Sequence, residues 1–300
     1  MSMVATLANK RLMIVGCGYV GMAVAREACR AGLRVEALTR NLGRAAELRS
    51  LGVHTVVADL AAETWHGRLA PDADLVLNCV SSGRGRLEDY RQSYVEGMRS
   101  LLAWVQRGAA GTLVYTSSTS VYPEDGGVVV DEEASTEGVG ETGRILLEAE
   151  ELLRQGRNAC RRWFILRLAG IYGPERHHLL DQVRFGAAEM TGNGAAHLNL
   201  AHRDDICAAV FASFAAPESI SDDTFNVADD TPAPKAEVVR WLAEQLGRPM
   251  PRFNGGEASA RRGFTRPPDR LISNAKLKTK LGWKPRYPSF REGYASILSA

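Results

Sequence analysis

The chain has 300 residues, of which 45% are hydrophobic, 24% are charged and 7% are aromatic. These fractions are ordinary for a globular protein and exclude a collagen-like, low-complexity or disordered chain. The formal net charge is only +2, so the composition shows no basic footprint for nucleic acid and no charge attraction to a membrane surface. The length allows one large domain or two small ones.

The cysteines and the apolar runs exclude further classes of protein. Five cysteines occur at scattered positions, and none stands in the CxxC or CxxH spacing of a zinc site. An odd, scattered set argues against a disulfide framework, so we expect no metal and a reducing, cytoplasmic location. No apolar run reaches the roughly 18 residues that a membrane helix needs. Residues 1–10 contain one basic residue and no long apolar segment, which predicts no signal peptide.

Apolar, β-branched segments alternate with helical patterns through the first 170 residues. Strands are expected at 11–16, 34–39, 53–58, 74–79, 112–116 and 160–168, and helices at 18–31, 42–50, 88–107 and 142–155. The strands are too apolar to have a solvent-exposed face, which is typical of a parallel sheet covered on both sides by helices. The sequence therefore predicts an α/β fold with a doubly wound parallel sheet of the Rossmann type.

The pattern is looser after residue 170, where most of the prolines occur. Helices are expected at 203–215, 235–246 and near 289–298, and the basic, glycine-rich stretch 254–270 is expected to be a loop. We predict a first domain over 1–170 and a smaller C-terminal substrate domain over 171–300, with about 198–230 returning to the first. The second domain would lie over the carboxyl edge of the sheet, where open α/β folds bind ligands.

A glycine-rich motif follows the first predicted strand and opens the first predicted helix. Gly16, Gly18 and Gly21 form the pattern GxGxxG, with Tyr19 and Val20 between them. In this context the first glycine allows a tight turn, the second lets the backbone approach a pyrophosphate, and the third lets helix and strand pack closely. Backbone N–H groups and the helix dipole would then meet the phosphates. The motif predicts dinucleotide binding; the alternative is a glycine-rich turn without a ligand.

The end of the second predicted strand indicates which dinucleotide binds. A cofactor without a 2′-phosphate needs an acidic residue there to hold the ribose hydroxyls, but Glu36 lies three residues before the strand end. The end itself carries Thr39 and Arg40, and a guanidinium can hold a phosphate with two charge-assisted hydrogen bonds. We therefore expect NADP(H), with NAD as the alternative cofactor and with Asn41 or Arg44 as further contacts to the 2′-phosphate.

Several motifs stand in a fixed order along nearly the whole chain. They are GCGYVG at 16–21, Asp59-Leu60, YTSSTSVY at 115–122, RLAGIYGP at 167–174, HRDD at 202–205 and LGWKP at 281–285. Together they resemble the extended short-chain dehydrogenase/reductase superfamily, the NAD(P)-dependent epimerase/dehydratase group. The resemblance implies that Asp59, next to Leu60, accepts a hydrogen bond from adenine. It also implies nicotinamide contacts at Leu168, Ala169 and Gly170.

The resemblance is incomplete at the catalytic side chains, which in that family are a Ser or Thr and a Tyr-x-x-x-Lys pair. The serine, which binds the substrate oxygen, corresponds to Ser118. Thr142 stands where the tyrosine belongs and Leu146 where the lysine belongs, and none of the eight tyrosines is followed by a lysine four residues later. A threonine does not titrate near neutral pH and a leucine cannot lower a pKa, so the family's proton relay is missing.

Other side chains are candidates for the missing acid. Tyr122 has the right chemistry, although a place in the core is the favoured alternative. Arg144 can stabilise an oxyanion but cannot donate its proton, and the alternative is a solvated residue in the first turn of a helix. His177 and His178 lie further away. Adjacent side chains seldom face one ion, so they predict no metal site.

Three functional hypotheses remain. The first is an atypical NADP(H)-dependent oxidoreductase that acts on a small polar or carbonyl-containing metabolite. The second, favoured by the missing pair, is a non-catalytic, dinucleotide-sensing binding protein. The third, a nucleotide-sugar epimerase or dehydratase, is disfavoured because 192–200 contains no Arg or Lys, although Arg261, Arg262 and Arg266 could hold an anion. The expected partner is a small molecule, and a homodimer is an open option.

Overall fold

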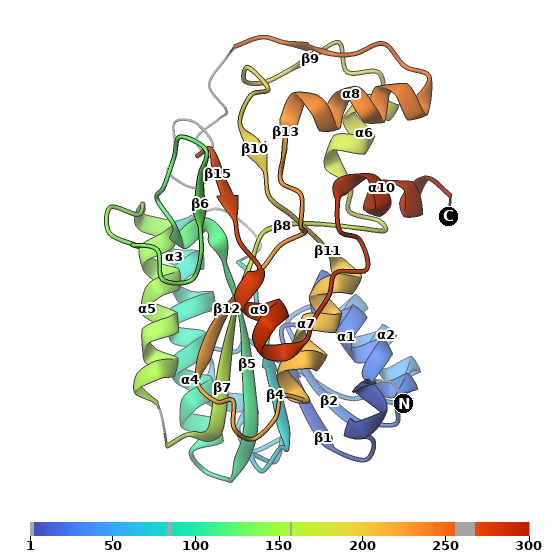
Figure 1. The fold of residues 1–300 in the computed structure, drawn as a ribbon. Coiled ribbons are helices and arrows are strands. Elements are labelled where there is room, and N and C mark those ends of the chain that lie inside the picture. Colours follow the sequence, from blue (N-terminus) through green and yellow to red (C-terminus); the bar gives the residue numbers. More distant parts are fainter. Residues whose placement is uncertain (1–2, 83–85, 157, 256–267, 300) are drawn as a thin grey trace.

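The centre of the molecule is a seven-stranded parallel sheet with the order β12-β7-β5-β4-β1-β2-β3 (Figure 1). The computed structural model describes residues 3–82, 86–156, 158–255 and 268–299. The sheet consists of β1 (Arg11–Val15), β2 (Arg34–Thr39), β3 (His54–Val57), β4 (Leu75–Asn78), β5 (Ala110–Ser118), β7 (Cys160–Leu168) and β12 (Asp223–Val227). The predicted parallel sheet is therefore confirmed. The edge strand β12, which the sequence pattern did not predict, adds a seventh strand.

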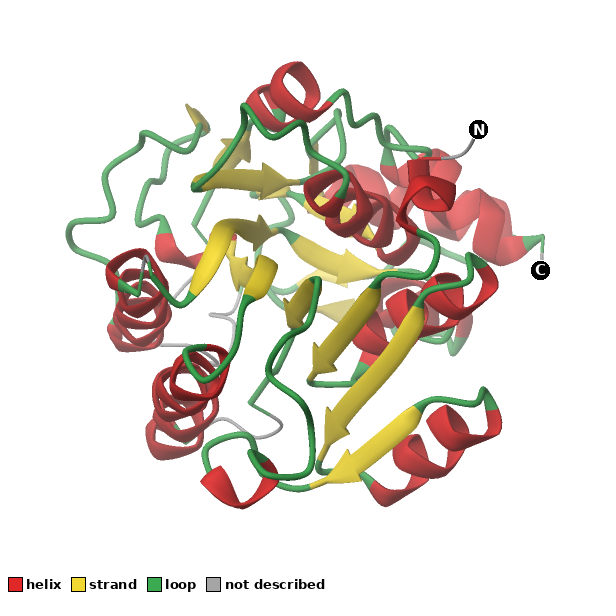
Figure 2. Cartoon of the chain, turned by 90° about the horizontal axis from the view of Figure 1, so that it is seen from below, coloured by secondary structure: helices red, strands yellow, loops and turns green. Residues whose placement is uncertain are grey.

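Helices cover both faces of this sheet (Figure 2). Successive residues of β1 point to opposite faces, so Leu12 and Ile14 belong to one apolar core and Met13 and Val15 to the other. The first core is shared with α1 (Tyr19–Arg30), α2 (Leu42–Ser50) and α7 (Arg203–Phe214), and the second with α4 (Gly97–Val105) and α5 (Glu141–Gln155). This arrangement confirms the doubly wound α/β architecture.

The segment predicted as one helix at 88–107 contains a change of helix type. It consists of α3 (Leu87–Arg91), a π-helical turn labelled η3 (Gln92–Glu96) and then α4. The predicted long helix is therefore present over 87–105, but its π turn was not predicted, because such a turn adds a residue without any change in composition. Such turns are frequent at functional sites.

The C-terminal part lies over the carboxyl ends of the strands (Figure 1). Its helices α6 (His178–Arg184), α8 (Lys235–Leu246) and α10 (Phe290–Leu298) surround a third apolar core. Short strands pair β8 (Gly170–Tyr172) with β11 (Leu200–His202), β9 (Glu189–Met190) with β14 (Arg252–Phe253), β10 (His197–Leu198) with β13 (Ala233–Pro234), and β6 (Val128–Val130) with β15 (Arg270–Ile272). Helix α9 (Ala275–Leu281) packs beside β12. Most of the predicted loop 254–270 lies outside the described residues.

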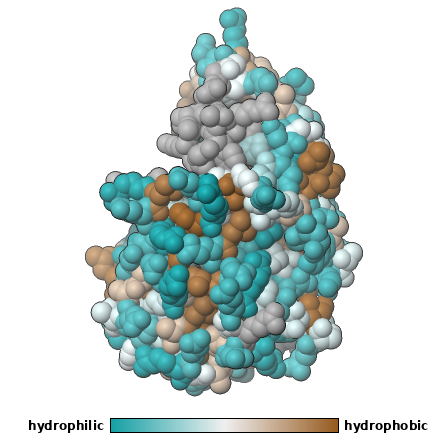
Figure 3. Space-filling model, turned by 90° about the vertical axis from the view of Figure 1, so that its left-hand side faces the viewer, coloured by the Kyte–Doolittle hydropathy of each residue, from teal (hydrophilic) through white to brown (hydrophobic). Residues whose placement is uncertain are grey.

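Large exposed apolar side chains are scattered over the described part of the surface. The face in Figure 3 is mainly hydrophilic, and its apolar residues stand in separate groups. Examples are Leu42 in α2, Val129 in β6 and Phe185 just after α6, which lie in different parts of the fold. The remaining short helical segments are η1 (Met3–Leu7), η2 (Glu63–Trp65) and η4 (Thr119–Val121). Among the described residues, no helix combines the length and the apolar character needed to cross a membrane.

Candidate active site

The predicted glycine motif forms the turn between β1 and α1. Gly16 has a φ of +90°, and a Cβ atom there would lie 2.5 Å from the backbone nitrogen of Val80. A Cβ atom at Gly21 would collide with the carbonyl oxygen of Gly16. These two positions therefore require glycine. A Cβ atom at Gly18, by contrast, would meet nothing within 4 Å, so open space borders this part of the turn.

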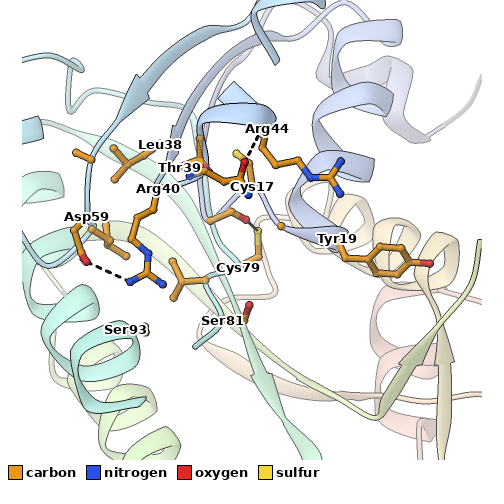
Figure 4. Close-up of a pocket in the computed structure, with 16 residues that line it drawn as sticks. Cys17, Tyr19, Leu38, Thr39, Arg40, Arg44, Asp59, Cys79, Ser81 and Ser93 are labelled. Carbon is orange, nitrogen blue, oxygen red and sulfur yellow. Dashed lines mark hydrogen bonds and ion pairs between the residues drawn. The ribbon is translucent and has the colours of Figure 1, made fainter. Parts of the chain in front are cut away.

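The open space lies at the amino end of α1. Gly18 is the N-cap residue and no side chain caps the helix, so its first N–H groups are available to a bound anion. Tyr19 points away from the turn (Figure 4), and its hydroxyl donates a hydrogen bond to the carbonyl oxygen of Pro174 at 2.6 Å. The guanidinium groups of Arg176 and Arg203 lie 5.5 and 5.4 Å from the centre of its ring. Tyr19 thus ties the glycine turn to the C-terminal part.

A first cavity, of about 280 Å³, extends from this turn along the carboxyl ends of β2 and β3. It follows the path from the phosphate-binding turn to the strand end where the ribose of a dinucleotide is recognised. Its walls include the residues predicted for that role, namely Thr39, Arg40, Arg44, Asp59 and Leu60.

Arg40 is the best placed of the side chains predicted to meet a 2′-phosphate. Its Nη1 lies 3.3 Å from Oδ2 of Asp59 (Figure 4), and its side chain is 53% exposed. An exposed pair of this kind is weak, so a phosphate can replace the carboxylate as its partner. The Oδ1 of Asn41 accepts the N–H of Arg44 and caps α2. The Arg44 guanidinium points away from Arg40 and pairs with Glu47 at 2.8 Å.

The acidic residue of β2 lies outside this cavity. Glu36 stands opposite Met13 in the sheet and forms an ion pair with Arg11 at 2.9 Å. It is absent from the described lining of the first cavity. The chain therefore offers no carboxylate from β2 to hold ribose hydroxyls, as the sequence predicts.

A second cavity, of about 350 Å³, adjoins the first. The two share wall residues of the glycine turn and of the segment after β4, among them Gly18, Tyr19 and Val80. The second cavity also contains the predicted substrate serine, the predicted nicotinamide contacts and the residue at the family's lysine position, that is, Ser118, Leu168, Ala169, Gly170 and Leu146. We call the two cavities together the cleft. The fold thus brings these predicted side chains into one place.

Ser118 is the last residue of β5. Its Oγ accepts a hydrogen bond from the backbone N–H of Ser120 at 3.1 Å. A hydroxyl that accepts in this way still has its own proton to donate, and the part of the chain that the structure describes shows no acceptor for it. Ser118 is therefore poised to donate a hydrogen bond into the second cavity.

The structure places Tyr122 in the core rather than in the cleft. Its side chain is fully buried, and its hydroxyl donates to Oδ1 of Asn226 at 2.8 Å and accepts from Nη1 of Arg167 at 2.9 Å. Burial raises the pKa of Tyr122. The residue does not appear in the described lining of the cleft. These contacts support the core interpretation over the acid role.

Thr142 and Arg144 lie in the first turn of α5, at the edge of the site. Thr142 is half-buried and Arg144 is exposed. Neither belongs to the lining of the second cavity as the structure describes it. An oxyanion role for Arg144 therefore has no geometric support, and the solvated alternative fits its position.

Several side chains that no sequence motif indicated also face the second cavity. Tyr90 and Tyr94 come from α3 and the π turn, with ring centroids 5.2 Å apart. Arg176 follows β8, and Arg270 begins β15. These residues belong to no local motif, because the tertiary fold alone brings them beside Ser118. The only sequence signal is the i, i+4 spacing of the two tyrosines, which places them on one side of a helix.

Metal ligation finds no support among the described residues. Within 3–82, 86–156, 158–255 and 268–299, no group of three or more His, Cys, Asp or Glu side chains could hold an ion. This includes the neighbourhood of His177 and His178. The arginines considered as anion ligands, Arg261, Arg262 and Arg266, lie outside the described residues.

Comparison of the sequence with known proteins identifies a family and two relatives. The sequence model of the NAD dependent epimerase/dehydratase family matches residues 12–228. A 3-diazoavenalumate denitrifying reductase from a Streptomyces species is 28% identical, in an alignment that covers 94% of this chain and 98% of that protein. A 2-alkyl-3-oxoalkanoate reductase from Stenotrophomonas maltophilia is 24% identical, covering 80% of this chain and 76% of that protein.

A solved structure shows the same architecture. It is a candidate NAD-dependent epimerase/dehydratase from Methylobacillus flagellatus, 28% identical to this chain. The TM-score is 0.77, and the superposition covers 97% of this chain and 98% of that one. The similarity therefore extends beyond the sheet into the C-terminal part.

Proposed function

Because the chain belongs to the NAD dependent epimerase/dehydratase family, we propose that it is an NADP(H)-dependent reductase of a small carbonyl-containing metabolite. The family and the reductase-named relatives support an NAD(P)-dependent oxidoreductase or epimerase-like role. One observation carries the finer proposal. The two adjoining cavities join the glycine turn to Ser118 within a single cleft.

The first cavity suits a dinucleotide. The open space beside Gly18 and the uncapped amino end of α1 match the needs of a pyrophosphate. Arg40 forms an exposed, weak pair with Asp59, which a 2′-phosphate can replace. Asp59 then becomes available for the hydrogen bond to adenine that the resemblance implies. These features support NADP(H) over NAD.

The second cavity provides the contacts that a carbonyl reduction needs from the protein. A bound nicotinamide supplies a hydride, and the chain must orient the acceptor and stabilise charge. The Ser118 hydroxyl can donate a hydrogen bond to the carbonyl oxygen, where negative charge develops as the hydride reaches carbon. Leu146 excludes water from the wall where the family places a lysine. The resulting alkoxide is a strong base, so water or a tyrosine hydroxyl facing the cavity can protonate it.

The missing acid favours a second candidate acceptor within the reductase class. One relative is named for the reduction of a diazo compound. When an aryl diazonium ion receives a hydride, the products are the arene and N₂, so atoms and charge balance without any proton from the protein. A cleft that lacks the Tyr-x-x-x-Lys pair is suited to such an acceptor.

The proposal is tested by following NADPH oxidation at 340 nm in the presence of candidate acceptors. The panel contains aldehydes, ketones, 3-oxo acids and an aryl diazonium salt, each with NADH as the matched comparison. We expect NADPH to be consumed with at least one carbonyl compound. Consumption with the diazonium salt alone would favour the second candidate. Tight dinucleotide binding without turnover of any acceptor would instead support the binding-protein hypothesis.

A further inference from the structure

The charged residues that line the second cavity all carry the same sign. Among its described lining residues only Arg176 and Arg270 are charged, and no Asp or Glu is present. The other polar groups there are hydroxyls of serine, threonine and tyrosine. A cavity of this composition attracts an anion.

Arg270 is buried and has an unusual set of partners. It is 7% exposed, and its guanidinium donates hydrogen bonds to the backbone carbonyl oxygens of Tyr122 and, at 2.9 Å, of Thr119. Within the described parts of the chain, no carboxylate forms an ion pair with it. Carbonyl oxygens satisfy two donors but do not neutralise the charge, and further N–H donors remain for a ligand.

Two other buried arginines have fuller sets of partners. Arg167 forms a bidentate pair with the buried carboxylate of Glu150, at 2.7 and 3.0 Å. Arg162, at the opposite end of the sheet, donates four hydrogen bonds to one threonine hydroxyl and three backbone carbonyl oxygens. Among the described residues, Arg270 finds neither a carboxylate partner nor a full set of acceptors. Because buried charges are normally paired, we expect a bound ligand to supply the missing partner.

Two carboxylates lie near enough to Arg270 to act on its charge. Glu124 and Asp125 act on Arg270 through their charge without forming an ion pair with it. Burial nevertheless lowers the pKa of Arg270 below its ordinary value, so the nearby carboxylates do not fully offset the loss of hydration. A carboxylate placed against the guanidinium would remove this deficit.

We propose that Arg270 anchors a carboxylate group of the substrate. The carbonyl oxygens that it binds belong to Thr119 of η4 and to Tyr122, the residue that follows η4. Because η4 directly follows Ser118, Arg270 is bound to the same short segment that carries the proposed oxygen-binding hydroxyl. A substrate held at one end by Arg270 would present its reducible group toward Ser118 and the nicotinamide contacts. This inference rests on the proposed function, and it narrows the substrate to small carboxylic acids that carry the reducible group.

The test measures binding of a simple carboxylate and its neutral analogue to the protein saturated with NADP⁺. Benzoate and benzamide are nearly equal in shape and differ in charge. By calorimetry we expect benzoate to bind at least about tenfold more tightly than benzamide, the ratio that one charge-assisted hydrogen bond gives. In Arg270→Gln the ratio should fall to about one, while NADP⁺ affinity stays unchanged. Arg162→Gln, the matched buried arginine away from the cleft, should keep the wild-type ratio.

Several results would overturn the inference. Equal affinity for both probes in the wild type, or no benzoate binding at all, would contradict it. Weaker NADP⁺ binding in Arg270→Gln, or competition between inorganic phosphate and the cofactor at this site, would assign Arg270 to the cofactor's phosphates. If Arg270→Gln does not fold, Arg270→Lys takes its place, because it keeps the charge but loses the planar guanidinium. Its ratio of benzoate to benzamide affinity should lie between one and the wild-type value. Binding needs no turnover, so benzoate selectivity together with a failed NADPH screen would reject the proposed function alone.

Discussion

The two cavities of the cleft are built in different ways. The first is made largely of backbone: a positive-φ glycine, an uncapped helix end and the carboxyl ends of β2 and β3. The second depends on side chains from η3, β5, α5, β8 and β15. In the first, the glycine motif and Asp59 match the motifs that carry the resemblance. In the second, Ser118 agrees, but Leu146 stands where the resemblance implies a lysine, and Thr142, at the position of the tyrosine, lies outside the described lining.

This difference shows which part of a dinucleotide enzyme can change. The phosphate-binding turn depends on the conformation of its whole backbone. A Cβ atom at Gly16 or Gly21 would collide with neighbouring backbone atoms, so most substitutions there would disrupt the turn. Side-chain chemistry is carried by single residues, which can be replaced while the fold is kept. A chain can therefore keep its dinucleotide site while the side chains that contact the substrate oxygen change.

The largest effect is expected from Gly18→Val. A branched side chain would fill the open space at the amino end of α1 and exclude a pyrophosphate, so dinucleotide binding should be lost. The fold should survive because Gly18 has a φ of −81°, which other residues adopt. Gly67→Val is the control, since a Cβ atom there also meets nothing within 4 Å and lies outside the cleft. Retained NADPH affinity in folded Gly18→Val, measured by calorimetry, would refute this site.

Ser118→Ala tests the side-chain half of the comparison. Losing a hydrogen bond that strengthens in the transition state should lower kcat/KM by roughly ten- to a thousandfold. Thr142→Ala, at the family's tyrosine position but outside the described lining, should change it far less. Steady-state kinetics with an acceptor from the NADPH screen provide the readout. Full activity in Ser118→Ala would remove this residue from the mechanism.

Arg40→Ala tests the cofactor preference within the first cavity. The variant should lose NADPH affinity by about ten- to a hundredfold and leave NADH affinity nearly unchanged, because only the 2′-phosphate contact is removed. Arg99→Ala is a matched control, since the Arg99 side chain is also 53% exposed and lies away from the cavity. Equal dissociation constants of the wild type for the two dinucleotides would contradict the NADP(H) assignment.

The smallest effect is on stability and concerns the buried C-terminal side of the fold. Burial raises the pKa of Asp229 to about 8, so between about pH 4 and 8 the folded state holds a proton that the unfolded chain releases. The free energy of unfolding should therefore fall as the pH rises through this range. Asp229→Asn should come closest to the wild type near pH 4 and exceed its Tm by a few degrees at pH 9. Urea unfolding at both pH values gives the change in the free energy of unfolding with pH. If this change is the same in the variant as in the wild type, the raised pKa of Asp229 is contradicted.

The sequence predicted those features that are encoded locally. The glycine turn works through consecutive residues, and the core strands of the sheet are apolar runs, so both could be found from pattern alone. Arg40 was identified because its position at a strand end follows from the strand itself. The role of Asn41 was less clear, because capping α2 and contacting a phosphate call for the same polar side chain.

The remaining features depend on tertiary structure. The strand β12 begins with two polar residues, Asp223 and Thr224, and contains a third, Asn226, so it is not an apolar run, and its place at the sheet edge is decided by pairing with β7. The π turn has no compositional signal. Arg270 stands 152 positions after Ser118 and reaches the cleft only through the pairing of β15 with β6. Such contacts are not visible in any local window of sequence.

The most direct test of a reductase without the family's acid is the fate of the hydride. NADPH that carries deuterium at both C4 positions is incubated with the wild-type protein and an acceptor, and the product is analysed by mass spectrometry. We predict one deuterium on the carbon that was reduced, with transfer lost in Gly18→Val and slowed in Ser118→Ala. A protein that binds NADPH tightly but transfers no deuterium to any acceptor would contradict the account.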